Sequence, residues 1–101
     1  MEDITVQELK ERKDKNENLH IIDVREPYEY EEYNFGAELV PLATLESKLE
    51  EMEDLKDQEL IVHCKSGARS AAAKVFMTQK GFTKVRSLIG GAMAYQELEL
   101  K

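Results

Sequence analysis

Cys64 is the single cysteine of the chain, and the residues after it are of types that activate a thiol. It follows the apolar, strand-like run 60–63 and precedes a short polar segment that contains a glycine. At such a strand-to-helix turn, successive backbone N–H groups form an anion-binding nest, and nearby cations further lower the pKa of a thiol. The pattern predicts a nucleophilic thiolate at Cys64. The expected substrate-binding residues are Lys65, Ser66, Gly67, Ala68, Arg69 and Ser70.

Two residues of this segment have more specific expected roles. Gly67 permits a positive φ or a close backbone approach that other residues resist. Arg69 either hydrogen-bonds an anionic substrate or holds the loop by pairing with a carboxylate such as Asp23 or Glu26. A lone cysteine after an apolar strand can also be an inert buried side chain. The cations and donors around Cys64 favour the nucleophile over that alternative.

The elements that position Cys64 follow from the alternation of helix and strand signals along the chain, which predicts an α/β domain with a mostly parallel sheet. The strands are expected at 19–24, 39–42, 60–63 and 85–89, and the helices at 5–13, 27–33, 44–52, 67–80 and 92–98. Thr44 should cap its helix, which buries an apolar stripe made of Leu45, Leu49 and Met52. The apolar face expected on helix 67–80 consists of Ala68, Ala71, Ala72, Val75 and Phe76.

Charged residues near the strand ends are expected beside Cys64. Because the carboxyl ends of parallel strands lie at one edge of a sheet, Asp23, Arg25 and the loop after Cys64 should share a rim. We expect Asp23 to anchor the loop rather than to act as a base. Arg25 either lines the site or forms a surface pair with Glu26. His63 should be structural, because strand alternation points its side chain away from that of Cys64.

Size and charge argue against several classes of protein. The chain has 101 residues, which predicts one domain over 1–101, and its formal net charge is −7. A nucleic-acid or anionic-membrane binder needs a basic surface, so neither partner is expected. No apolar stretch is long enough to span a bilayer and no signal-peptide pattern opens the sequence, so we expect a cytoplasmic protein. One cysteine and two scattered histidines do not supply a structural zinc site, and we expect neither metal nor cofactor.

Three motifs, in this order, resemble the rhodanese family. They are Ile22-Asp23-Val24-Arg25-Glu26-Pro27-x-Glu29-Tyr30, Cys64-x-x-Gly67-x-Arg69-Ser70 and Val85-x-x-Leu88-x-Gly90-Gly91. The resemblance covers nearly the whole chain. It implies a five-stranded parallel sheet with helices on both faces, a cysteine loop that serves as the catalytic cradle, and a cysteine that cycles between thiolate and persulfide.

The chain departs from this family in two places. Where relatives usually read Gly-His-Ile-Pro-Gly-Ala, this sequence has Tyr33-Asn34-Phe35-Gly36-Ala37, so we expect the rim opposite the active site to be shaped differently. After the Gly-Gly pair the aromatic residue is Tyr95 instead of the usual Trp. Tyr95 can still fill a core position, and we expect no catalytic consequence.

The number of residues between Cys64 and Arg69 favours one reaction class over another. The loop also resembles the tyrosine-phosphatase signature, but it has four residues between Cys64 and Arg69 where that signature has five. A smaller ring of donors suits the terminal sulfur of a persulfide, and no general-acid loop is visible. We therefore predict a sulfurtransferase that takes sulfur from thiosulfate or a persulfide and gives it to a thiol, cyanide or a protein. Two alternatives remain, a persulfide carrier or regulatory module with weak turnover and, well behind, a phosphatase or arsenate-type enzyme.

Overall fold

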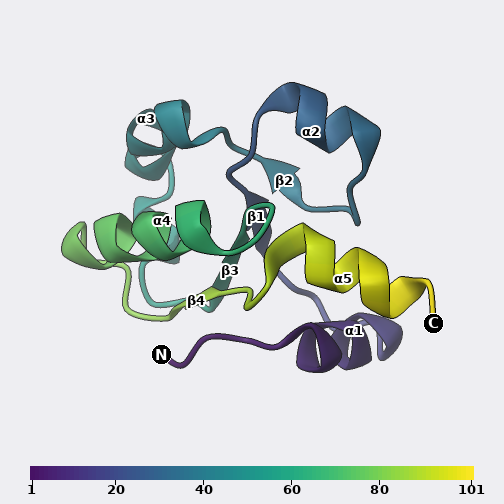
Figure 1. Cartoon of the computed structure of the whole chain (residues 1–101). Coiled ribbons are helices and arrows are strands. Elements are labelled where there is room, and N and C mark those ends of the chain that lie inside the picture. Colours follow the sequence, from purple (N-terminus) through teal and green to yellow (C-terminus); the bar gives the residue numbers. More distant parts are fainter.

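A computed structural model describes residues 1–101 and shows a parallel sheet at the centre of the molecule (Figure 1). Its four strands lie in the order β2-β1-β3-β4. They are β1 (Ile21–Asp23), β2 (Glu38–Leu39), β3 (Leu60–His63) and β4 (Val85–Ser87). The predicted α/β class with a parallel sheet is confirmed.

The sheet has four strands where the resemblance implied five. At the position of a fifth strand, beside β4, there is a single parallel bridge between Ile4 and Leu88. Ile4 N donates to Ser87 O at 3.0 Å, and Ile89 N donates to Ile4 O at 2.9 Å. The pairing stops there because a helix begins at Val6 and takes over the backbone hydrogen bonds.

Five helices surround the sheet, and they lie on both faces as predicted (Figure 1). In Figure 1, α1 and α5 lie together to the right of the strands, and α3 and α4 lie to their left. None of the helices is long and apolar enough to cross a membrane. The helices are α1 (Val6–Asp14), α2 (Pro27–Glu32), α3 (Leu45–Glu50), α4 (Ala68–Gln79) and α5 (Gly91–Glu99), and two short 3-10 turns are η1 (Leu42–Thr44) and η2 (Glu53–Leu55).

Alternation along β3 divides its side chains between two hydrophobic cores. Val62 and Cys64 enter the core that includes residues of α3 and α4. Ile61 enters the core beneath α1 and α5, and His63 stacks on Phe35 of that same core. The expected opposite orientation of His63 and Cys64 is therefore observed.

Local capping explains where the first helices begin and where one expectation was wrong. Thr5 Oγ1 accepts a hydrogen bond from Glu8 N at 3.1 Å, as the sequence predicts for the start of α1. Thr44 was expected to cap a helix in the same way, but its hydroxyl donates to Pro41 O at 2.9 Å. Residues 42–44 consequently form the turn η1, and α3 begins at Leu45.

The predicted apolar face of α4 is wrong. Its buried residues are Ser70, Ala73 and Met77, whereas Ala68, Ala71, Ala72 and Val75 are exposed and Phe76 is only partly buried. Both faces of this helix carry small apolar residues, so hydrophobic periodicity alone could not choose between them. In the observed rotation of the helix, Ser70 faces the Cys64 sulfur and its N–H donates to Sγ at 3.3 Å.

Candidate active site

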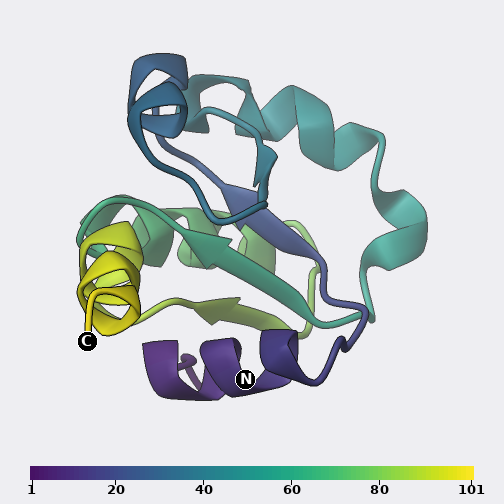
Figure 2. The same cartoon turned by 90° about the vertical axis from the view of Figure 1, so that its right-hand side faces the viewer.

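Cys64 follows directly after β3, at the carboxyl edge of the sheet. Figure 2 shows the loop after β3, in green, passing between α2 and α5 at this edge. The Cys64 side chain is only 1% exposed, and its Sγ accepts hydrogen bonds from Gly67 N at 3.1 Å and Ser70 N at 3.3 Å. Ser70 Oγ lies 3.6 Å from the same sulfur. The donors of the loop therefore converge on Sγ, which is the arrangement that stabilises a bound anion.

The pKa of Cys64 reflects two opposing effects. Burial raises the pKa, but hydrogen bonds from the Ser70 side chain and from the backbone N–H groups of Ser70, Gly67 and Ser66 lower it. Their sum holds the Cys64 pKa below the ordinary value of a thiol. Donors of the loop itself, more than the cations named in the sequence analysis, favour the thiolate.

The backbone of the loop needs glycine at two places. Gly67 has a φ of 117°, the left-handed conformation that the sequence indicated. Gly91, at the start of α5, was not singled out on its own, yet a Cβ there would lie 2.6 Å from the carbonyl oxygens of Cys64 and Lys65. Those two carbonyls accept from Ala92 N at 2.8 Å and Met93 N at 3.0 Å. The first turn of α5 thus holds the loop from the side opposite α4.

Arg69 is held by a carboxylate, but not by either of the two expected. Its two terminal nitrogens donate to Glu29 of α2 at 2.8 and 2.9 Å, so neither Asp23 nor Glu26 is its partner. These hydrogen bonds lower the pKa of Glu29 to about 2. Glu29 Oε1 also accepts from Glu26 N at 2.9 Å in a capping box, which fixes the carboxylate at the first turn of α2.

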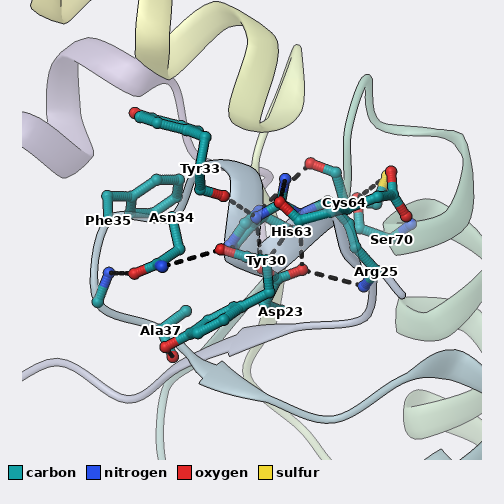
Figure 3. Close-up of polar contacts among 12 residues, drawn as sticks. Asp23, Arg25, Tyr30, Tyr33, Asn34, Phe35, Ala37, His63, Cys64 and Ser70 are labelled. Atoms are coloured by element: carbon teal, nitrogen blue, oxygen red, sulfur yellow. Dashed lines mark hydrogen bonds and ion pairs between the residues drawn. The ribbon is translucent and has the colours of Figure 1, made fainter. Parts of the chain in front are cut away.

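Asp23 and Arg25 form a buried ion pair (Figure 3). Arg25 Nη2 donates to Asp23 Oδ2 at 2.8 Å and to Tyr33 O at 2.7 Å. Arg25 therefore does not pair with Glu26, and Asp23 does not anchor the Cys64 loop directly. The pair instead fixes the end of α2, and α2 in turn presents Glu29 to Arg69.

His63 lies on the other side of the strand from the sulfur, against Phe35 (Figure 3). The two ring centroids are 4.5 Å apart, and Phe35 also stacks on Tyr95 at 4.2 Å. Burial lowers the pKa of His63, an effect that nearby Asp23 opposes. His63 is thus placed as a structural residue, and the departure from the family pattern at 33–37 supplies the ring that covers it.

Comparison with known protein families identifies the family of this chain. The sequence model of the rhodanese-like domain matches residues 5–98. The chain belongs to the rhodanese family. Its α/β sheet and the three motifs agree with that assignment.

Individual rhodanese relatives are similar over most of this chain. YrkF of Bacillus subtilis (strain 168), a putative sulfur carrier protein, is 34% identical over 90 residues, 88% of this chain and 48% of that protein. A sulfurtransferase of Allochromatium vinosum is 29% identical over 94 residues, 92% of this chain and 86% of that protein. A rhodanese-related protein from Thermoplasma volcanium has a crystal structure similar to this one, with a TM-score of 0.83 and 28% identity over 97% of this chain and 93% of that chain.

The chain spans only part of several curated relatives that it matches. It covers about half of YrkF, 48%, and 24% of an adenylyltransferase/sulfurtransferase of Mycobacterium tuberculosis named MoeZ and described as probable.

Two hollows flank the ends of the rhodanese sheet. A cavity of about 180 Å³ adjoins the Cys64 loop, between α2 and α5. The residues that line it are Arg25, Tyr28, Glu29, Glu32, Tyr33, Lys65, Ala92, Met93 and Gln96. A wider groove of about 1030 Å³ includes His20, Glu38 and Glu59 at the opposite, amino edge of the strands, away from Cys64. No group of three or more His, Cys, Asp or Glu side chains is arranged to hold a metal ion.

Proposed function

We propose that this rhodanese, as a single domain over residues 1–101, is a sulfurtransferase that carries sulfur on Cys64. The donor is thiosulfate or a persulfide, and the acceptor is a thiol, cyanide or a protein. The observation that supports this most is the convergence of Gly67 N and Ser70 N on a buried Sγ, at 3.1 and 3.3 Å. Such a cradle stabilises the thiolate before the reaction and a persulfide anion after it.

In the proposed reaction the Cys64 thiolate attacks the outer sulfur of the donor. A new S–S bond forms to Sγ, and the old S–S bond breaks with its electron pair leaving on sulfite or on the donor thiolate. The product is the Cys64 persulfide anion. An acceptor such as cyanide then attacks the outer sulfur of this persulfide, which gives thiocyanate and restores the thiolate.

The roles of the surrounding residues belong to the same proposal. Residues 65–70 bind the substrate and the persulfide, with Lys65 as the side chain that orients an incoming anion. Asp23 and Arg25 support the site at a distance, because their buried pair positions the helix that holds Arg69. The cytoplasm is the proposed compartment, since a free thiolate persists under reducing conditions.

A sulfur carrier is the second candidate. The relative YrkF is itself described as a putative sulfur carrier protein. A carrier loads sulfur but turns over slowly without its protein partner, and the acidic chain, with net charge −7, suits a basic partner.

Mass spectrometry tests the shared step of both candidates. After incubation with thiosulfate or a small persulfide, we expect the mass of one sulfur atom to be added to the protein and to be absent from Cys64→Ser. Thiocyanate production with cyanide then separates an efficient enzyme from a slow carrier. If no donor adds sulfur to Cys64, or if p-nitrophenyl phosphate is hydrolysed faster than sulfur is transferred, the proposal is wrong.

A further inference from the structure

The two cations near Cys64, Lys65 and Arg69, are not equally available to bind a substrate. Arg69 donates two hydrogen bonds to Glu29, at 2.8 and 2.9 Å, and the Glu29 side chain is only 11% exposed. Because Glu29 is also held by Glu26 N at 2.9 Å, it cannot follow Arg69 toward the sulfur. Lys65 is exposed and forms no ion pair. One free cation therefore faces a donor instead of the two expected from the sequence.

The carboxylates near the loop reduce its attraction for anions still further. Glu29 and Glu32 both line the 180 Å³ cavity beside Lys65. Glu32 is exposed on α2 and forms no ion pair. The charge of Arg25, which also lines the cavity, is paired with buried Asp23. The two negative charges match those of Lys65 and Arg69, so the approach to Cys64 carries no excess positive charge. A dianion such as thiosulfate gains little there, and the Cys64 thiolate repels it.

Part of the wall of the same cavity, next to the loop, is apolar. The side chains of Tyr28 and Met93 line it, and they are 63% and 50% exposed. At roughly 30 Å³ per water molecule, its 180 Å³ corresponds to about six waters, the size of a cysteine-like body. Lys65, the residue next to Cys64, lies at its wall. An organic group bound here would lie beside the cradle.

We propose that the cavity between α2 and α5 binds the carbon body of a cysteine-like persulfide donor, and that Glu29 determines specificity by withholding Arg69 from inorganic dianions. This inference rests on the proposed function and selects among its donors. The Cys64 thiolate attacks the outer sulfur of the donor RSS⁻. The RS–S bond breaks, RS⁻ leaves with the electron pair, and the Cys64 persulfide anion retains the other negative charge.

Glu29→Gln tests the charge of the site. The variant keeps the side-chain length and the acceptor for Glu26 N, and it removes the charge that holds Arg69. We expect kcat/KM for thiosulfate to rise about fivefold and that for cysteine persulfide to stay within about twofold. Glu31→Gln is the matched control, because it removes one charge from the exposed surface of α2 outside the cavity without touching Arg69, and it should change kcat/KM for both donors by less than about twofold.

Met93→Ala tests the cavity. It should raise KM for cysteine persulfide about threefold or more and leave KM for thiosulfate unchanged, because only the organic donor loses apolar contact. Val75→Ala, on the exposed face of α4, should change neither. We compare kcat/KM for free cysteine persulfide with that for a peptide carrying one cysteine persulfide. A higher value for the free amino acid identifies a small-molecule donor, and a higher value for the peptide identifies a protein donor.

The outcomes separate this inference from the proposed function. Equal changes for both donors in Glu29→Gln, an equal effect of Glu31→Gln, or an unchanged persulfide KM in Met93→Ala would each overturn it, even though Cys64 still loads sulfur. Failure of every donor to load sulfur on Cys64 would instead overturn the proposed function. Thermal unfolding of each variant shows whether a loss of activity is a loss of fold.

Discussion

The hydroxyl oxygens of Ser70 and Ser87 lie 2.7 Å apart, beneath the loop that surrounds the Cys64 sulfur. Ser70 Oγ is also 3.2 Å from Gly67 O and 3.6 Å from Sγ. When Ser87 donates to Ser70, the single hydroxyl hydrogen of Ser70 is shared between Gly67 O and the sulfur. The backbone of Ser87 is itself held, since its N–H donates to Asp3 Oδ1 at 3.0 Å.

Ser70→Ala should therefore raise the pKa of Cys64. The hydroxyl contributes to lowering that pKa against the effect of burial, and its loss removes one hydrogen bond to the thiolate. For a hydrogen bond worth about 1 kcal/mol, the ratio of thiolate to thiol at a given pH falls roughly fivefold. The rate of Cys64 alkylation across a pH series measures this change. Ser66→Ala is the control, because the Ser66 hydroxyl makes no hydrogen bond, and a shift of equal size there would contradict the assignment.

The Glu29–Arg69 pair should make stability depend on pH in the acid range. The pKa of Glu29 is lowered from 4.5 to about 2 in the folded chain, so the pair stabilises the fold at pH values above the unfolded pKa. That contribution is lost as the pH falls from about 4.5 toward 2. Urea unfolding of the native chain and of Glu29→Gln should differ at pH 6 and converge near pH 2. A difference that stays constant across this range would show that Glu29 carries no depressed pKa.

Gly91→Ala should disrupt the loop from the side of α5. Gly91 has a φ of 60°, and an added Cβ would lie 2.6 Å from the carbonyls of Cys64 and Lys65. Strain and backbone displacement together should cost about 3 kcal/mol or more and abolish sulfur loading. Gly36→Ala is matched to it, with a φ of 96° and no heavy atom within 4 Å of the added Cβ. That control should lose about 1 kcal/mol and keep activity, and comparable losses would rule out crowding at Gly91.

Asp23→Asn should leave Arg25 as an uncompensated buried charge. Because Asp23 is 0% and Arg25 4% exposed, we expect a loss of about 3–5 kcal/mol in the free energy of unfolding. Asp14→Asn breaks the exposed pair with Lys10 and should cost no more than about 0.5 kcal/mol. Urea denaturation compares the two, and a loss below about 1 kcal/mol at Asp23 would show that its pair with Arg25 does not hold the end of α2.

Much of this fold could be read from short-range signals. The apolar run that ends at His63 fixed the place of β3, and the glycine after Cys64 indicated the turn into α4. The capping pattern at Thr5 and the proline at Pro27 located the starts of α1 and α2. These features depend on neighbours within a few residues, which is why they are legible in a single sequence.

The contacts that complete the site depend instead on distant segments. Arg69 and Glu29 are 40 residues apart, and nothing local to Arg69 distinguishes Glu29 from Asp23 or Glu26 as its partner. The rotation of α4 was missed for a related reason, since the buried face of this helix packs against β3 and β4 and is not decided by its own sequence. Ser87 lies in β4 at an unspecified position of the third motif, and only the parallel pairing with β3 brings it beneath the loop.

The buried position of Cys64 also prevents its sulfur from reaching the sulfur of a second copy of the chain. A disulfide between two copies would require their Cα atoms to approach within roughly 7 Å, yet each sulfur is a member of its own hydrophobic core and is 1% exposed. Two such recessed thiolates cannot come together without opening both loops. The fold thus lowers the pKa of its one cysteine and at the same time protects it from oxidation to a disulfide between two copies of the chain.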